Sequence, residues 1–141
     1  MAATDTLPPK KYLKVSLFLT KLPELSDEQF HEYWRTKHLQ LALENKSFST
    51  KVRRYNQAKL TAAQHHSSAS LKSQASEFGL PVVAYDGVAE VWVDDLNTWK
   101  EIVSDPDFAA AIASDEKKFM QRPIHVMLGY DELKIGKEVR E

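Results

Sequence analysis

The chain has 141 residues, which is the size of one ordinary domain with its own hydrophobic core. Its 19 lysines and arginines nearly balance its 20 aspartates and glutamates, so the charge pattern argues against a nucleic-acid or membrane surface and favours a small, roughly neutral partner. Because the chain has no cysteine, a disulfide framework, a thiol nucleophile and a zinc-thiolate site are excluded. The first residues contain no apolar leader segment, and no apolar run approaches the roughly 20 residues that span a bilayer, which predicts a cytoplasmic protein.

The first half of the chain predicts a strand, a helix and a second strand. Apolar residues alternate over 12–20, as in a half-buried strand. Ser26 or Asp27 is a suitable N-cap for a helix that continues to about Leu43, where the polar sequence ENKSFS interrupts the apolar period. Residues 51–60 predict the second strand.

Two segments do not fit a strand or a long helix. Residues 1–10 predict an N-terminal tail. The polar segment 61–81 is rich in Ala, Ser, Gln and His and ends in glycine and proline, so we expect a long surface loop or a lid over a pocket. Neither segment predicts a second domain, and residues 1–141 are therefore interpreted as a single domain.

The second half repeats the order of elements. Residues 85–94 are the clearest strand, and residues 95–103 predict a helix. Pro106 begins a further helical run that Pro123 is expected to end, and residues 124–133 predict the last strand. The order β-α-β-β-α-β is typical of the α+β ferredoxin-like fold, an antiparallel sheet with helices on one side.

Both faces of the predicted sheet carry large apolar side chains. In the third strand one face carries Val88, Glu90 and Trp92, and the other carries Ala89, Val91 and Val93. The chain has helices to cover only one face of such a sheet. We therefore expect the sheet of a second protomer on the other face, in a homodimer with two-fold symmetry.

A histidine lies in the apolar stripe of the first helix. At about 100° per residue, Phe30, Trp34, His38 and Leu41 fall within one quadrant of the helix, so His38 faces the core. Imidazole titrates near neutral pH, which makes a histidine in this position a candidate for proton transfer. The alternative is a half-buried histidine whose partner is a backbone carbonyl.

His125 and Tyr55 are further candidates on the strands. His125, near the start of the last strand, either lines a pocket from below or ends the strand in solvent. Tyr55 shares one face of the second strand with Arg53. That arginine either clamps a substrate carboxylate or is a solvated charge at the sheet edge.

The third strand contributes Glu90, Trp92 and Asp86. Burial raises the pKa of a carboxyl placed like Glu90 unless a cation pairs with it, and an ion pair with Arg53 or Arg54 is the structural alternative. Asp86 is either a residue at the pocket mouth or part of the turn before the strand. Trp92 is most simply a core residue.

The sequence predicts neither a metal nor an organic cofactor. His31 and His38 share one side of the helix but are about 10 Å apart at 1.5 Å per residue, which is too far for one ion. His65 and His66 are adjacent in a polar segment without a partner at ligand spacing. The chain has only four glycines, and none of them forms a glycine-rich phosphate loop.

Three segments resemble a known family: FHEYWRTKH in the first helix, YDGVAEVWVDD in the third strand, and SDPDFAAAIASDEKKFM after it. Together they resemble the EthD family of dimeric α/β-barrel proteins over residues 12–133, and within it the small fungal tailoring enzymes of aromatic polyketide pathways. Trp34 and His38 match the family's Trp-x-x-x-His element, whereas Gln40 stands where many members have proline. The resemblance implies a ferredoxin-like protomer, a face-to-face dimer that forms a dimeric α/β barrel, and cofactor-free chemistry.

The activity that this resemblance implies is decarboxylation of an aromatic polyketide acid of the anthrone or atrochrysone type. Proton transfer would fall to His38 and His125. Contacts with the substrate would come from the residues Phe30, Trp34, Tyr55, Asp86, Glu90 and Trp92. Dehydration or cyclisation of a polyketide intermediate would use the same residues in another order. The remaining alternative is a non-catalytic dimeric barrel that binds a hydrophobic metabolite.

Overall fold

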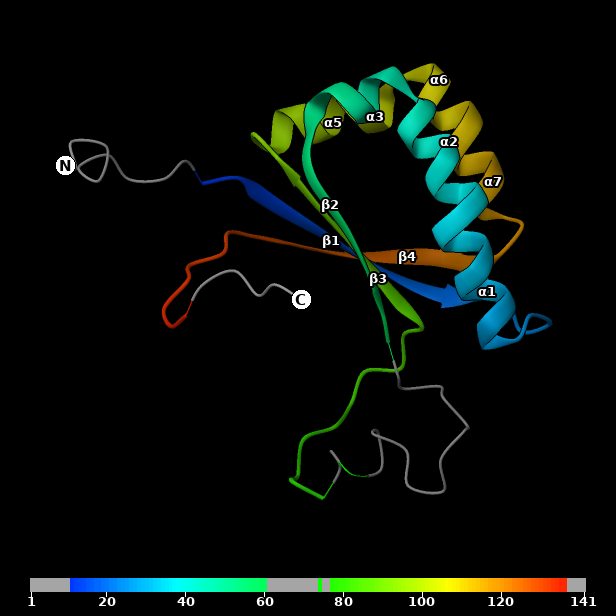
Figure 1. The fold of residues 1–141 in the computed structure, drawn as a ribbon, viewed down its shortest axis with the longest axis vertical. Helices are drawn as coiled ribbons and strands as arrows, with labels where there is room; N and C mark the ends of the chain where they lie inside the picture. The colour runs from blue at the N-terminus through cyan, green and yellow to red at the C-terminus, as the bar shows by residue number, and fades with distance from the viewer. Residues whose placement is uncertain (1–10, 61–73, 75–76, 137–141) are drawn as a thin grey trace.

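The computed structural model describes residues 11–60, 74 and 77–136. It contains one antiparallel sheet of four strands in the order β2-β3-β1-β4. The strands are β1 (Leu13–Lys21), β2 (Val52–Lys59), β3 (Gly87–Val93) and β4 (Met120–Gly129). Figure 1 shows the helices gathered on one side of this sheet. The arrangement is the ferredoxin-like α+β fold that the order of the elements predicts.

Each of the two connections across the sheet is helical and contains one π-helical turn. The first connection consists of α1 (Asp27–Tyr33), η2 (Trp34–His38), α2 (Leu39–Glu44) and α3 (Lys46–Lys51). The second consists of α5 (Leu96–Ser104), α6 (Pro106–Phe108), η3 (Ala109–Ala113) and α7 (Ser114–Glu116). In the described part of the chain, no helix is long and apolar enough to cross a membrane.

Polar side chains cap the helices where the sequence changes from apolar to polar. Ser26 and Gln29 form a capping box at the start of α1, with bonds of 3.0 and 2.9 Å to each other's backbone N–H groups. Asn45 caps α3 through the N–H of Phe48 at 3.0 Å. The segment ENKSFS therefore ends one helix as predicted, but it also begins α3, which the apolar pattern did not predict.

The predicted bounds of the last strand were wrong. β4 begins at Met120 and contains Pro123, whereas the sequence pattern predicts that this proline ends the preceding helix and that the strand begins at residue 124. Among the described strands β4 is at the edge and pairs with β1 alone, and the pairing shifts register between Phe18 and Thr20, opposite the proline. A strand can tolerate a residue without an N–H group at such an edge and irregularity.

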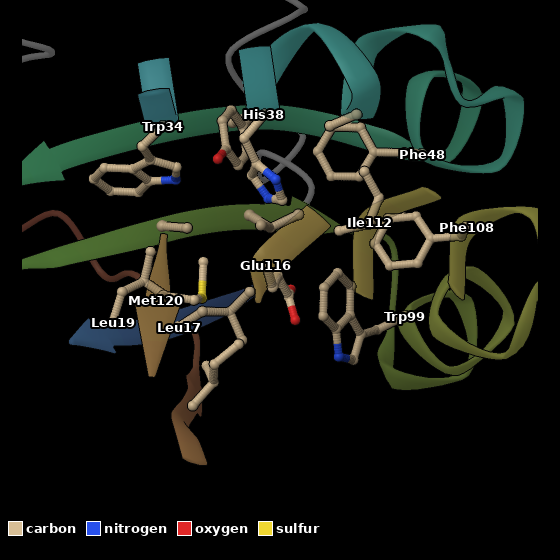
Figure 2. A pocket seen from close by; sticks show the side chains of 15 residues that line it. Leu17, Leu19, Trp34, His38, Phe48, Trp99, Phe108, Ile112, Glu116 and Met120 are labelled. Carbon is tan, nitrogen blue, oxygen red and sulfur yellow. The ribbon is translucent and has the colours of Figure 1, made fainter. Parts of the chain in front are cut away.

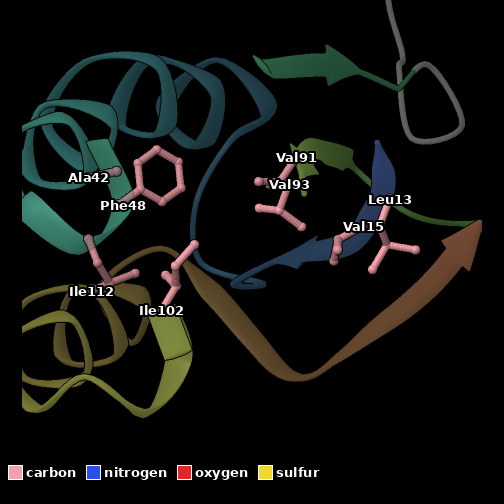
Figure 3. Packing of buried hydrophobic residues seen from close by; sticks show 8 residues of the cluster. All are labelled: Leu13, Val15, Ala42, Phe48, Val91, Val93, Ile102 and Ile112. Atoms are coloured by element: carbon pink, nitrogen blue, oxygen red, sulfur yellow. The ribbon is translucent and has the colours of Figure 1, made fainter. Parts of the chain in front are cut away.

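The core lies between the sheet and the helices. Figure 3 shows one cluster of eight buried residues, which come from both layers: Leu13, Val15, Ala42, Phe48, Val91, Val93, Ile102 and Ile112. A second cluster surrounds Phe30, Trp34 and Phe119. The predicted tail 1–10 and most of the predicted loop 61–81 lie outside the described residues.

Gly87, the first residue of β3, packs directly against a core tryptophan, and this contact leads to a stability prediction. A Cβ atom at Gly87 would lie 2.6 Å from Cζ3 of the Trp34 indole, and Trp34 is only 2% exposed. We expect Gly87→Ala to lower the free energy of unfolding by roughly 1–3 kcal/mol, because the ring must move within a packed core. Urea denaturation measures this difference. Gly129→Ala is the control, since an added Cβ there meets nothing within 4 Å, and equal losses in the two variants would contradict the prediction.

Candidate active site

A cavity of about 60 Å³ lies between the sheet and the helices (Figure 2). This volume has room for several water molecules. Most of its fifteen lining residues are aliphatic or aromatic, and the residues with acid-base or hydroxyl groups are His38, Tyr55 and Glu116. The cavity is therefore an apolar space with a few polar groups in its wall, which is typical of small-molecule sites.

His38 is the last residue of η2, and its ring extends into the space between the two layers (Figure 2). The side chain is buried, with 7% of the residue exposed. Its Nδ1 lies 2.9 Å from Oδ2 of Asp115 in α7, so the partner is a carboxylate and not the backbone carbonyl of the alternative interpretation. Because Nδ1 is the nitrogen engaged with Asp115, Nε2 is the nitrogen that can meet a ligand.

Asp115 is the central residue that the sequence analysis missed. It is 4% exposed, and its Oδ1 accepts a hydrogen bond of 2.6 Å from the Tyr33 hydroxyl. The Lys118 ammonium lies 3.6 Å from the same oxygen. In the sequence this aspartate stands in the polar run SDEKK, which looks like an ordinary solvated face. Its only signal is its place two residues after the apolar segment AAAIA.

Burial and hydrogen bonding fix the charges of this pair. Burial lowers the pKa of His38 and outweighs the opposing hydrogen bond and charge of Asp115. Burial alone would raise the pKa of Asp115, but hydrogen bonds from Tyr33 and His38 outweigh it and hold that pKa below its usual range. At neutral pH the pair is therefore a neutral imidazole that donates Nδ1–H to an ionised carboxylate, with the lone pair on Nε2.

Tyr55, on β2, supplies a neutral hydrogen-bond donor to the cavity. Burial raises the pKa of this phenol, so the hydroxyl stays protonated. The Gln57 side chain donates to its oxygen at 3.1 Å. Because the hydroxyl oxygen accepts in this bond, its hydrogen is left for a ligand.

Glu116 is a second acid in the cavity wall that the sequence analysis did not single out. Its carboxylate accepts a hydrogen bond of 2.6 Å from the Arg122 guanidinium. Burial raises the pKa of Glu116, and the charge of Arg122 opposes this rise. None of the fifteen lining residues is a lysine or an arginine, so Arg122 pairs with this acid from outside the cavity.

The structure brings together three of the predicted site residues, which are His38, Trp34 and Tyr55. Phe30 is completely buried behind the wall, with its ring centroid 5.9 Å from that of Trp34. The Asp86 carboxylate accepts a 2.8 Å hydrogen bond from the backbone N–H of Lys21. Phe30 and Asp86 therefore support the layers around the cavity without lining it.

The other predicted residues lie on the opposite face of the sheet. His125 pairs in register with Phe18, whereas Leu17 and Leu19 line the cavity, so His125 points away from His38. Its Nδ1 lies 2.8 Å from the Tyr85 hydroxyl. Within one chain, the structure does not bring the two histidines together.

Glu90 and Trp92 share that opposite face. Glu90 forms the ion pair of the structural alternative, with Lys14 at 3.1 Å as its partner. Lys14 is opposite Trp92 on the neighbouring strand, which places its ammonium diagonally beside Glu90. Arg53 instead binds Asp94 through two bonds of 3.0 Å, and the Trp92 indole donates to Asp131 at 3.1 Å.

Within the described residues, no three His, Asp or Glu side chains are grouped so that they could hold a metal ion. The polar groups of the cavity suit proton transfer instead: one base, one neutral phenol and one carboxyl. A ligand with oxygen atoms on a flat apolar body would match this lining.

Several solved structures share this fold. An EthD family protein of Bacillus halodurans is similar over 86% of this chain and 99% of its own, with a TM-score of 0.55 and 16% identity. A hydroxynitrile lyase of Passiflora edulis is similar over 91% of this chain and 100% of its own, with a TM-score of 0.56 and 9% identity. A dimeric protein of unknown function from Bacteroides fragilis, described as having a ferredoxin-like fold, is similar over 86% and 96%, with a TM-score of 0.52 and 9% identity.

At these identities the likenesses establish the fold alone. A comparison with curated proteins gave no match. The family itself is established from the sequence, because the model of the EthD domain matches residues 22–123, which is most of the chain. The protein is a member of the EthD domain family.

Proposed function

We propose that the protein is a cofactor-free lyase that decarboxylates an aromatic acid of the polyketide type. The observation that carries this proposal is the buried pair of His38 and Asp115, joined at 2.9 Å in the wall of an apolar cavity. The substrate class is a β-keto acid, or an ortho-hydroxyaryl acid in its keto tautomer, since both have a carbonyl oxygen that can take up the electrons of the breaking bond.

The reaction needs one proton in addition to the substrate carboxylate. The substrate enters with this proton, which is shared between its carboxyl group and Nε2 of His38. The bond between the carboxyl carbon and its neighbour then breaks, CO₂ leaves, and the electron pair moves onto the adjacent carbonyl oxygen. Nε2–H finally gives its proton to the resulting enolate, at the carbon that lost CO₂ in a β-keto acid or at the oxygen in the keto tautomer of a hydroxyaryl acid. Asp115 stabilises the imidazolium while His38 carries the proton.

Tyr55 suits the oxygen on which negative charge develops. Its hydroxyl is neutral and has its hydrogen left to donate, so it can strengthen a hydrogen bond as the charge grows. The apolar lining favours loss of the carboxylate charge, because the charge is more dispersed in the transition state. A cavity of about 60 Å³ holds the reacting end of a polycyclic acid, and the remaining rings would lie toward Trp99 and Phe108.

A second candidate is dehydration of a polyketide alcohol. It is favoured by the lowered pKa of His38, which leaves the imidazole neutral and ready to act as a base. The fold similarity to a hydroxynitrile lyase is a precedent for lyase chemistry in this architecture, without indicating which bond breaks. Mass spectrometry on a pool of candidate precursors distinguishes the readings, through loss of CO₂, loss of water, or retention of unchanged ligand in a binding protein.

Replacement of the histidine tests whether it carries the chemistry. We expect His38→Ala to lower kcat by ~10²–10⁴, the usual loss for a positioned acid or base, while the variant stays folded. Turnover and thermal melting are measured on the same preparation. Lys37→Ala, an exposed neighbour in the same turn, is the matched control. A folded His38→Ala protein with full activity would remove His38 from the mechanism.

The pH profile separates the two reactions. Decarboxylation requires one proton shared between the substrate carboxyl group and the imidazole. We therefore expect kcat/KM to fall as pH rises through the pKa of His38, which burial lowers from its usual value. Dehydration requires the neutral base, so kcat/KM rises through the same pKa to a plateau. Asp115→Asn removes the negative charge that favours imidazolium, and the limb should move to lower pH in either case. If the pH dependence of kcat/KM is the same in Asp115→Asn as in the wild type, the titrating group is not His38.

We further propose that a second copy of the chain covers the open face of the sheet. This face carries Phe18, Val88 and the exposed Met127, and a structure of the same fold is described as a dimeric protein. The paired polar groups on it, such as Lys14 and Glu90, would lie within the contact. Such a homodimer would be the face-to-face barrel that the resemblance implies.

Sedimentation equilibrium at micromolar concentration should give the mass of two chains. Met127→Glu should give the mass of one chain, because it places an unpaired charge in the contact. Val103→Glu, an exposed apolar residue of α5 on the helical side, is the control and should leave the mass of the dimer unchanged. A wild-type protein with the mass of one chain would contradict the proposal.

A further inference from the structure

Both oxygens of the Asp115 carboxylate accept hydrogen bonds from side chains of the first helical connection. The Tyr33 hydroxyl donates to Oδ1 at 2.6 Å, and Nδ1–H of His38 donates to Oδ2 at 2.9 Å. Tyr33 also packs on Phe119, with ring centroids 5.2 Å apart. The hydroxyl belongs neither to the cavity wall nor to the proton transfer described above.

The π-helical turn makes this double contact possible. Tyr33 and His38 are five residues apart, and in an α-helix such residues point about 140° away from each other. In the turn η2 the backbone bonds span five residues, as the Leu39 N–H shows by bonding to the Trp34 carbonyl, so residues five apart lie on the same side. The extra residue of the turn thus aims both side chains at Asp115.

We infer that Tyr33 is a positioning residue that fixes the orientation of the Asp115 carboxylate, and through it the tautomer of His38. With Oδ1 engaged by Tyr33, Oδ2 remains directed at Nδ1–H, and the Nε2 lone pair is held toward the cavity. The Tyr33 hydroxyl also draws part of the negative charge of Asp115 toward itself. This inference rests on the proposed function only where turnover is concerned, since the tautomer and titration of His38 are properties of the protein without substrate.

Tyr33 stays protonated over the range in which His38 titrates, because burial and the bond to Asp115 raise the pKa of Tyr33 to about 12. The other titratable groups near the pair are Glu116 on α7, Lys118 after it and Tyr55 on β2. None of them contacts Oδ2 of Asp115 in the described structure. Removal of the Tyr33 hydroxyl therefore acts on His38 through the carboxylate of Asp115.

The test is Tyr33→Phe, which removes the hydroxyl and keeps the ring against Phe119. The 15N NMR shifts of His38 in the substrate-free protein report its tautomer and its titration. We expect the pKa of His38 to rise, since the Tyr33 hydroxyl no longer draws negative charge of Asp115 away from the imidazolium. We also expect the Nδ1–H tautomer to become less populated, because the carboxylate is no longer held with Oδ2 toward Nδ1. With substrate, the pH limb of kcat/KM should move upward and kcat should fall roughly tenfold at unchanged KM, less than the ~10²–10⁴ expected for loss of His38.

Tyr130→Phe is the matched control, because it removes a hydroxyl from an exposed tyrosine and should change none of these quantities. If Tyr33 only ties α1 to α7, Tyr33→Phe will lower the melting temperature and leave the His38 titration and tautomer as in the wild type, which overturns the inference. If no acid or alcohol is turned over, the proposed function fails, and the NMR titration still decides the role of Tyr33.

Discussion

The site depends on the hydrogen bond between Nδ1–H of His38 and Oδ2 of Asp115. A carboxylate that is 4% exposed is costly unless its oxygens are bonded, and the hydrogen bonds to Asp115 from Tyr33 and His38 come from the first helical connection. This single carboxylate therefore joins the two helical connections, which are far apart in the sequence. It also sets which nitrogen of His38 faces the cavity, so the same contact supports both the fold and the proposed chemistry.

The fold was predictable because its signals are local and periodic. The alternation over β1, the apolar stripe of α1 and the cap at Ser26 are each decided by a few neighbouring residues. The burial of His38 followed from the same stripe. The edge position of β4 is not local, since it depends on which strands pair, and this is why the proline at 123 was misinterpreted as a helix end.

The partners of His38 could not be predicted in the same way. Asp115 is 77 residues away in the sequence, in a polar run with no pattern of its own. Two π-helical turns, one ending at His38 and one ending two residues before Asp115, change the facing of each side chain relative to a straight α-helix. A stripe counted at 100° per residue continues from His38 to Leu41, whereas the buried residue of α2 is Ala42, one position later.

The contact between Gly87 and Trp34 divides the cavity into a rigid end and an adjustable end. The indole is held against the backbone of a central strand, so that wall cannot retreat without disturbing the pairing of β3 with both of its neighbours. The opposite walls, Trp99 and Phe108, belong to short helices and are only half-buried. Under the proposed function, substrate size would be selected at the helices α5 and α6, and changes there would alter which molecules are accepted while the pair of His38 and Asp115 keeps its geometry.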